Sequence, residues 1–514
     1  MQTISQSVFS NFANIKKVLR SAGRKSAVSI MAGLLVSGCG AMRSYDNELS
    51  HTISKASSGQ ISSALLHLEE KNTFGKKDLL YYMEKGELQK LNGQFSDSRE
   101  SWLLADEKVK IWEEEAKFTP ENLLGNIGSV LVNDKMRRYD GQDFEKVMLS
   151  TRLALNHVLI GNFDEARTEI KKTHEREAII AEFRAMAVAR VEAESEERQV
   201  KTEVSDIRGY PVETLNDPEV ILLKNSYQSA FGHYLAGFIY EALNEPSLAA
   251  PGYRMAIELR PDIVFLQEGL AGLDTRIGKR KKSETDVLFV VETGSIPART
   301  SVSLPVPAHL RGLWVAVPIS FPIIRAEKSV FLPTQLNINN QDTKIYPITN
   351  LDAMARRTLK DDMPGIILRG VIRTTAKTAA QMAVANQSQL AGLAVGLLVN
   401  ATESADERGW RTLPSHILIG RTTLPAGKHT IRIEGPFGTK TETIEIAGSH
   451  AVVPIRLMGE TQYVSQQYIS PEIMAESMAA YLEESSSTDV IAKPTMKKKP
   501  TKPNIKPIKL GVNQ

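Results

Sequence analysis

The chain has 514 residues, of which 42% are hydrophobic and 24% are charged, a composition typical of globular domains. Its single cysteine excludes an intramolecular disulfide and any site that needs several thiolates, such as structural zinc or an iron–sulfur cluster. The net charge of +3 hides an acidic body: residues 39–492 carry 51 basic and 60 acidic residues, so we expect no binding of nucleic acid there.

Residues 1–38 have the three parts of a secretory signal peptide. A basic segment ends at Lys25, an apolar core covers residues 27–36, and the small residue Gly38 precedes Cys39. The core is shorter than the roughly 20 apolar residues that a membrane-spanning helix needs. The sequence VSGC at 36–39 resembles the bacterial lipobox, which implies cleavage between Gly38 and Cys39 and lipid attachment at Cys39. The alternative is an ordinary buried cysteine in an uncleaved N-terminal helix.

The residues after the cysteine predict where the chain is held. Several acyl chains anchor a protein stably, whereas one gives only marginal membrane binding. Gly40 stands where an aspartate would resemble an inner-membrane retention signal, so we expect a lipid-anchored protein of the outer membrane that faces the periplasm. Residues 39–60 are polar and rich in serine, which predicts a tether.

Residues 61–275 have apolar residues at helical spacings, and three windows repeat one pattern. In each window a small residue lies seven places before a turn residue, a second small residue follows the turn by five, and a larger residue follows that by four. The residues that define the repeats are Gly86, Gly93, Trp102, Ala105, Ala154, Gly161, Ala166, Gly237, Tyr240, Ala249, Tyr253, Ala256 and Pro261.

This pattern resembles the tetratricopeptide repeat, a pair of antiparallel helices of about 34 residues. Small residues let the two helices approach closely, aromatic residues fill the gap to the next repeat, and Gly or Asn accepts a left-handed backbone at the turn. The first window departs from the pattern, because Ser98 stands where alanine is usual. Helical inserts separate the windows, and the insert 172–202 predicts a long solvated helix, so we expect an irregular array.

The basic run 276–282 is interpreted as a solvated linker between domains. From 284 to 458 the hydrophobic period changes to that of strands, with Gly and Pro between them and a hairpin across 435–439. These features predict a β-sandwich or half-barrel. The expected fold class is therefore α+β with several domains: an irregular helical repeat array followed by a β-sandwich-like domain. We expect limited proteolysis near 276–285 to yield separate helical and β fragments.

A helical insertion is expected at 350–400 within the β-rich region. Its second half, 390–399, is a run of ten apolar residues that is too short to span a membrane. We favour a core helix packed on the sheet, and the alternative is a helix that faces the membrane or a partner.

Residues 459–514 predict a short helix beginning at Pro471, then a disordered tail rich in Lys and Pro. The tail either solubilises the protein or contacts anionic polymers through Lys497, Lys498, Lys499 and Lys502.

Motifs for catalysis are not evident in the sequence. His174-Glu175 lacks the second histidine of a zinc-protease helix, and residues 435–441 have the wrong spacing for a phosphate-binding loop. There is no nucleophile elbow and no dinucleotide-binding fingerprint. We therefore expect no catalytic residues, no metal and no cofactor, and a protein that is not an enzyme.

As a whole, the chain resembles an uncharacterised family of bacterial outer-membrane lipoproteins with an irregular tetratricopeptide-repeat half and a β-rich half. The most similar segments are 141–156, 351–360, 410–414 and 424–429. The resemblance implies a periplasmic scaffold or assembly factor whose partners are other envelope proteins or lipoproteins. We expect it to bind them through a groove of the repeats and through the β-rich domain. The alternatives are an activator of peptidoglycan synthesis or of envelope-machine assembly that contacts the cell wall through its tail, and an enzyme that acts on the wall.

Overall fold

The computed structural model describes residues 45–72, 77–125, 138–310, 313–327, 329–385 and 405–489. Among these residues, no helix is long and apolar enough to cross a membrane. Several predicted features lie outside the described residues: the signal peptide, Gly38, Cys39, the apolar run 390–399, Lys497, Lys498, Lys499 and Lys502.

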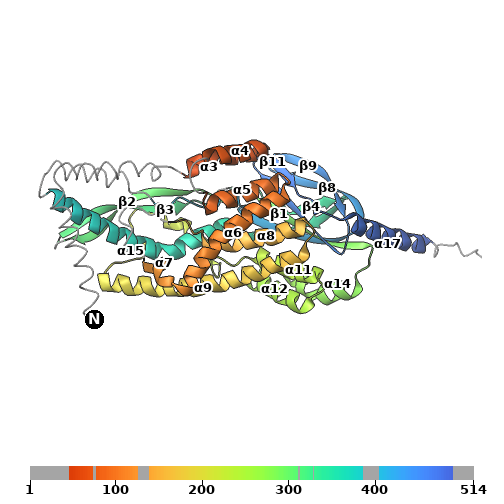
Figure 1. Cartoon of the computed structure of the whole chain (residues 1–514), viewed down its shortest axis with the longest axis horizontal. Helices are drawn as coiled ribbons and strands as arrows, with labels where there is room; N and C mark the ends of the chain where they lie inside the picture. Colours follow the sequence, from red (N-terminus) through yellow and green to blue (C-terminus); the bar gives the residue numbers. More distant parts are fainter. Residues whose placement is uncertain are drawn as a thin grey trace, which may run out of the picture.

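The first part of the described chain is helical, and sheets follow it (Figure 1). Two short 3-10 turns, Val204–Asp206 and Val212–Thr214, interrupt the helices. The helices of this part are α3 (Tyr45–Ser57), α4 (Ile61–Lys71), α5 (Leu79–Leu91), α6 (Phe95–Phe118), α7 (Pro120–Gly125), α8 (Asp143–Leu159), α9 (Phe163–Arg198), α10 (Pro218–Ile221), α11 (Ala230–Ala242), α12 (Pro246–Leu259), α13 (Val264–Ala271) and α14 (Leu273–Lys279).

The second part contains the strands and two further helices, α15 (Leu351–Ala385) and α17 (Pro471–Asp489). Both helices begin where the sequence predicts, because Leu351 follows a strand and Pro471 is suited to the first turn of a helix. The strands are β1 (Glu284–Thr293), β2 (Arg299–Leu310), β3 (Leu313–Ile324), β4 (Gln335–Ile338), β5 (Gln341–Lys344), β6 (Tyr346–Asn350), β7 (His416–Pro425), β8 (Gly427–Gly435), β9 (Gly438–Ile446), β10 (His450–Met458) and β11 (Thr461–Val464).

The described strands form three sheets. A five-stranded sheet has the order β11-β10-β1-β7-β6, a four-stranded sheet has the order β5-β4-β8-β9, and β2 and β3 pair as a separate hairpin. Within the largest sheet, β1 is parallel to β10 and antiparallel to β7. The five- and four-stranded sheets face each other across an apolar core to which β1, β4, β8, β9 and β10 all contribute.

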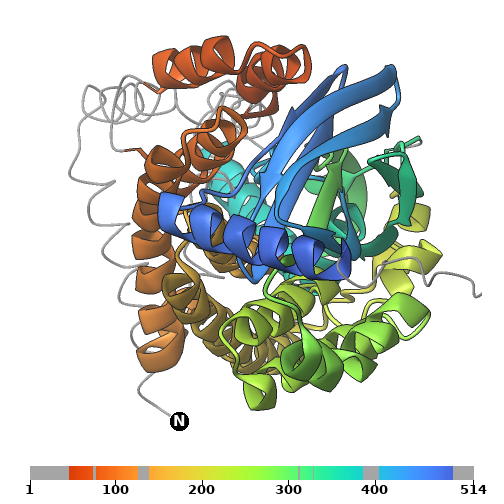
Figure 2. The same ribbon diagram turned by 90° about the vertical axis from the view of Figure 1, so that its right-hand side faces the viewer.

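Strand β1 is buried on both faces, which explains its continuous apolar sequence. Val287, Phe289 and Val291 point into the core between the two sheets. Leu288 and Val290 point the other way and join a larger core formed with the helices. The helices therefore curve around the far face of the five-stranded sheet, as Figure 2 shows.

The predicted tether at 39–60 is wrong for residues Tyr45–Ser57, which form helix α3. Leu49 and Ala56 are buried, and the Tyr463 hydroxyl donates a hydrogen bond to the Ala56 carbonyl at 2.5 Å. The buried positions recur at helical spacing among serines and charged residues, so the polar composition concealed an amphipathic helix.

The change from helix to strand falls where the sequence predicts, between the end of α14 and the start of β1. However, the two parts share one apolar core, which includes Leu153 of α8, Phe231 of α11, Leu288 of β1 and Ile419 of β7. The expected division into a helical domain and a separable β domain therefore does not describe the packing.

Proteolysis can test this shared core. Brief digestion with trypsin should cut at Arg280, Lys281 or Lys282, which are exposed between α14 and β1. The two fragments should nevertheless co-elute in size-exclusion chromatography and separate only in denaturant, because the core joins them. Two fragments that elute as independent folded bodies would contradict the shared core.

Candidate functional site

The predicted repeat residues lie at close crossings between consecutive helices. A Cβ atom on Gly86 of α5 would lie 2.4 Å from the indole nitrogen of Trp102 on α6, so only glycine fits there. The Trp102 indole donates a hydrogen bond to the Met83 carbonyl at 3.2 Å. Ser98, which replaces the usual alanine, donates its hydroxyl to the Gly86 carbonyl at 2.7 Å. The serine thus binds the backbone of the neighbouring helix at the crossing.

The third helix pair, α11 and α12, has an even closer contact. A Cβ atom on Gly237 would lie 2.8 Å from the Tyr253 ring. A Cβ atom on Gly252 would lie 2.7 Å from the Gly237 backbone nitrogen. The two helices therefore touch backbone to backbone, and Gly252 is a crossing residue that the sequence pattern did not single out.

The remaining repeat residues occupy turns and buried positions. The backbone φ angles of Gly93, Gly161 and Asn244 are 75°, 83° and 60°, which is the left-handed region expected at the turns. Pro261 is exposed just after α12. The residues that are buried between helices are Ala105, Ala154, Ala166, Tyr240, Ala249 and Ala256.

A loop of the second part fills the space between the first two helix pairs. Trp410 is fully buried, and its ring meets the Trp102 ring edge to face at a centroid distance of 6.3 Å. The Trp410 backbone amide donates to Glu145 of α8 at 2.7 Å. The next two backbone amides, of Arg411 and Thr412, donate to the two carboxylate oxygens of Glu84 on α5 at 2.7 and 3.0 Å. Two buried carboxylates thus hold three consecutive amides of the loop.

Burial controls the protonation of these two carboxylates. It raises the pKa of Glu84 to about 7, although the hydrogen bonds from Thr412, Arg411 and Tyr45 act in the opposite direction. Burial also raises the pKa of Glu145, against the hydrogen bonds from Tyr139 and from the Trp410 backbone amide. The attachment of the loop is therefore sensitive to pH near neutrality, and neither glutamate was predicted from the sequence.

A second buried cluster joins the helices to β1. Glu292 of β1 pairs with Arg152 of α8 and lies 3.2 Å from the Lys90 ammonium of α5. Burial alone would raise the pKa of Glu292, but the Arg152 guanidinium and the Lys90 ammonium outweigh it and hold the pKa at about 2. Glu87 lies 3.5 Å from Arg152 in the same cluster. These side chains are almost completely buried, so losing one partner would leave a charge without compensation.

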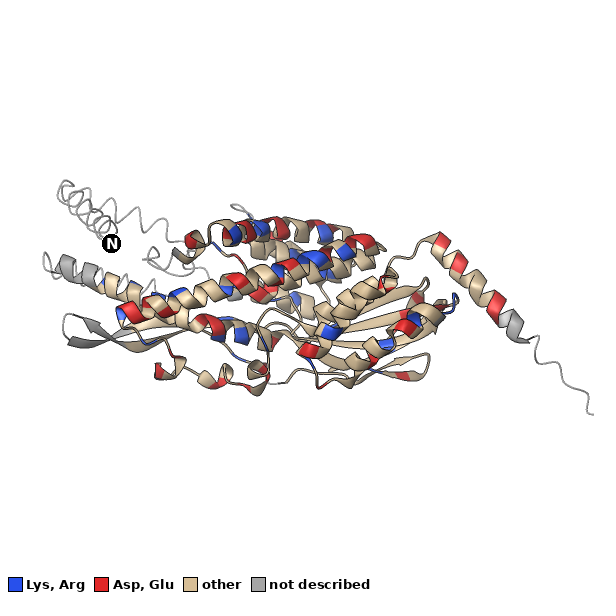
Figure 3. Cartoon of the chain, turned by 90° about the horizontal axis from the view of Figure 1, so that it is seen from below, with Lys and Arg blue, Asp and Glu red and all other residues tan. Residues whose placement is uncertain are grey.

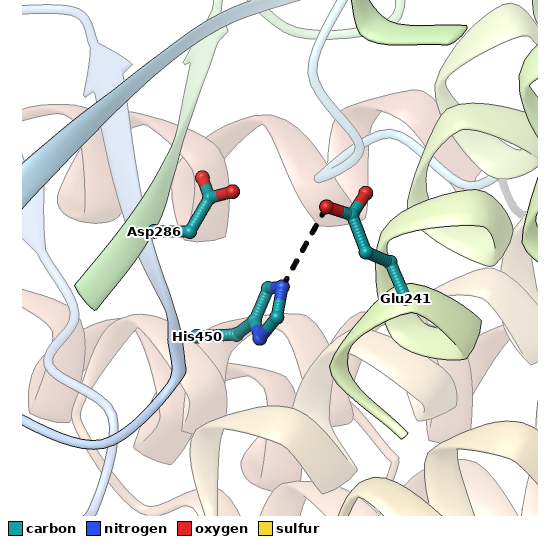
Figure 4. Close-up of side chains that lie close together, drawn as sticks. All are labelled: Glu241, Asp286 and His450. Atoms are coloured by element: carbon teal, nitrogen blue, oxygen red, sulfur yellow. Dashed lines mark ion pairs between the residues drawn. The ribbon is translucent and has the colours of Figure 1, made fainter. Parts of the chain in front are cut away.

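A third cluster contains residue types that bind metal ions, but its carboxylates are already paired with arginines. Glu241 of α11, Asp286 of β1 and His450 of β10 converge as Figure 4 shows, with a distance of 3.9 Å between Glu241 and the His450 Nε2 atom. Arg276 lies 2.6 Å from Glu241, and Arg421 lies 2.6 Å from Asp286. Two guanidinium groups already neutralise the two carboxylates, and a cation would have to displace one of them. The cluster instead links the third helix pair to the sheet.

An open cleft lies at the N-terminal end of α8, on the outer side of the helical region. It has a volume of about 420 Å³ and is bounded by α6, α7, α8, α9 and α15. Trp112 and Phe183 meet edge to face in its wall at 5.5 Å. The other apolar residues of the wall are Leu123, Leu124, Ala187, Val188, Val191 and Pro364.

Four charged residues of this cleft neutralise one another. Asp143 lies 2.9 Å from Lys146 and also pairs with Arg184, which lies 3.2 Å from Asp362. The Lys146 ammonium stands 3.8 Å from the centre of the Trp112 ring. An apolar floor with a neutralised rim suits a protein segment that presents apolar side chains. The arrangement offers no nucleophile paired with a base.

The pKa of Glu84 predicts how stability depends on pH. The ordinary value of 4.5 applies to the unfolded chain and about 7 to the folded chain, so the Glu84 contribution to stability is present below pH 4.5 and is lost as the pH rises through 7. Glu84→Gln should remove about 3 kcal/mol of the stability difference between pH 5 and pH 8, measured by denaturant unfolding.

Glu434, which is exposed on β8, gives a matched control. Glu434→Gln should keep the pH dependence of the wild-type protein. Equal pH dependence in Glu84→Gln and the wild type would show that the Glu84 carboxyl does not titrate between these pH values.

Comparisons with known proteins give no assignment. No family model and no curated protein matches this chain. Among solved structures, a tetratricopeptide repeat protein from Parabacteroides merdae aligns with 13% identity over 45% of this chain and 98% of that chain. The TM-score is 0.13, which establishes no shared fold.

Proposed function

We propose that this protein is a scaffold of the bacterial envelope, anchored by lipid on Cys39, which binds other envelope proteins and catalyses no reaction. The lipobox-like sequence before Cys39 supports the anchor and the periplasmic location. The glycine crossings of α5–α6 and α11–α12, and the left-handed turns of all three helix pairs, support a tetratricopeptide-like origin for α5–α6, α8–α9 and α11–α12.

The inner side of the helices is occupied by other parts of the same chain, and this determines where a partner can bind. In helical repeat proteins the concave surface is the usual binding surface. Here the Trp410 loop and the five-stranded sheet occupy the inner side of the helices. The expected groove of the repeats is therefore occupied by the chain itself, and the proposed partner binds elsewhere.

The open cleft beside α8 is the single observation that carries this proposal. Its apolar wall is accessible, since Val188 is 50% exposed, and Asp143, Lys146, Arg184 and Asp362 are already paired with one another. A partner would insert apolar side chains beside these four charges, whose pairing lowers the cost of desolvating them. The proposed ligand is a segment of another envelope protein, either helical or extended.

Site-specific crosslinking tests this assignment in intact cells. A photoreactive amino acid at Val188 should crosslink to one discrete envelope protein, because Val188 lies in the wall of the cleft. Adding Val191→Glu in the same wall should abolish the crosslink, since the larger charged side chain would narrow the cleft and replace part of its apolar wall.

The control position is Val264 on α13, which is 63% exposed and lies outside the cleft. It should not crosslink to the same protein. A crosslink of equal yield from Val264, or a Val188 crosslink that survives Val191→Glu, would contradict the assignment.

A further inference from the structure

One end of the molecule is an arm made of the β2–β3 hairpin and the second half of α15 (Figure 1). The two strands pair without interruption from Arg299↔Ile324 to Leu310↔Leu313 and join neither of the larger sheets. A two-stranded ribbon is marginally stable in water by itself. Helix α15 supports it, since a Cβ atom on Gly370 would lie 2.7 Å from the Ile319 side chain.

The arm differs in charge from the acidic body. No Asp or Glu occurs between Arg299 and Ala326, and none occurs in α15 after Asp362. The strand residues 300–310 and 313–324 carry no Lys or Arg either. Figure 3 marks acidic residues along the body helices, in contrast to the described strands of the arm.

The pairing register gives the hairpin two faces. The face that contains Val302 and Leu304, with their partners Phe321 and Ile319, packs in the core with α15. The opposite face is covered near the base of the hairpin, where Ser320 and Pro322 are buried. Farther along, at Ser303, Pro305 and Pro318, this face is exposed, and we call this part the outward face. An exposed ribbon without charges is unusual, because charges on edge strands normally prevent association.

Another protein strand is a poor candidate to cover this ribbon. Pro305 and Pro307 on β2, and Pro318 and Pro322 on β3, lack the amide hydrogen that an added strand would need. The hairpin therefore has an uncharged face and edges that cannot pair with another strand. Such a surface can contact a partner that requires no directional hydrogen bonds. The interface of a lipid bilayer is such a surface.

The start of the described chain lies close to the base of the hairpin. The Ala405 amide donates to the Ser301 hydroxyl at 3.1 Å, and Glu407 and Arg408 line one cavity together with Tyr45. Cys39 precedes Tyr45 by six residues, which span at most about 20 Å when extended. A lipid on Cys39 would therefore hold the hairpin near the membrane surface.

We propose that the outward face of the β2–β3 hairpin docks on the phospholipid surface to which Cys39 anchors the protein. The inference rests on the proposed lipid anchor. Docking gives the protein a second membrane contact and fixes its orientation on the bilayer, with α17 at the opposite end of the molecule in Figure 1. An acid-free arm also avoids repulsion from anionic lipid head groups.

Quenching by lipid measures this contact directly. Cys39 is the only native cysteine, and acylation blocks its thiol, so a fluorophore on Ser303→Cys labels one position. In phosphatidylethanolamine–phosphatidylglycerol vesicles that contain spin-labelled lipid, the acylated full protein should be quenched several-fold more at position 303 than at Phe437→Cys. Phe437 is 70% exposed in the β8–β9 turn and provides the control.

A charged variant separates docking from mere proximity. Pro305→Asp with Pro318→Asp places two carboxylates on the outward face and should reduce quenching at position 303 to the control value. Circular dichroism and the unfolding midpoint should show that the protein stays folded. Phe437→Asp should leave the quenching unchanged.

The anchor and the docking have separate readouts. Mass spectrometry reports acylation of Cys39, and quenching reports the hairpin. Acylated protein with equal quenching at positions 303 and 437 would overturn the docking and leave the scaffold proposal in place. If mass spectrometry finds Cys39 without acylation, the anchor is wrong; quenching at position 303 of the Cys39→Ser variant in added vesicles would then still support the docking.

Discussion

Strand β1 is buried on both faces, and every charge that it carries must be compensated inside the protein. Glu292 meets this requirement with Arg152 and Lys90 from the helices, and Asp286 meets it with Arg421 from β7. Because the partners of Glu292 come from α5 and α8, the sheet can be buried only when the helices are in place. The helical and β-rich parts therefore form one body despite the sharp change of sequence pattern between them.

The same dependence explains why the helix pairs offer no free inner surface. Glu84 and Glu145 project from α5 and α8 toward the sheet, and the backbone amides of the Trp410 loop satisfy them. A repeat surface that could have bound a foreign segment instead binds a segment of its own chain. Binding of a partner is left to surfaces at the outside, where the cleft beside α8 combines apolar walls with paired charges.

Local patterns in the sequence predicted the local structure well. The spacing of Gly86, Gly93 and Trp102 placed a close helix crossing and its turn correctly, because neighbours within one helix pair are near in sequence. The strand run of β1 and the helix start at Pro471 were equally visible. Helix α3 was missed, since its few buried residues stand among serines and charges.

Contacts between distant segments could not be predicted. Glu145 binds an amide 265 residues away, and Glu84 binds one 327 residues away, so no local period records them. The open cleft also could not be predicted from the sequence, because its wall combines α7 with α15, which are far apart in the chain.

Hydrogen exchange of three backbone amides tests most directly whether the Trp410 loop occupies the inner surface of the helices. The backbone amides of Trp410, Arg411 and Thr412 lie in a segment without regular secondary structure, yet they donate to buried carboxylates. We predict that they exchange as slowly as the amides of β1, through unfolding of the whole core. Exchange as fast as that of the exposed β8–β9 turn would contradict the account, because the inner surface of the helices would then be open to a partner.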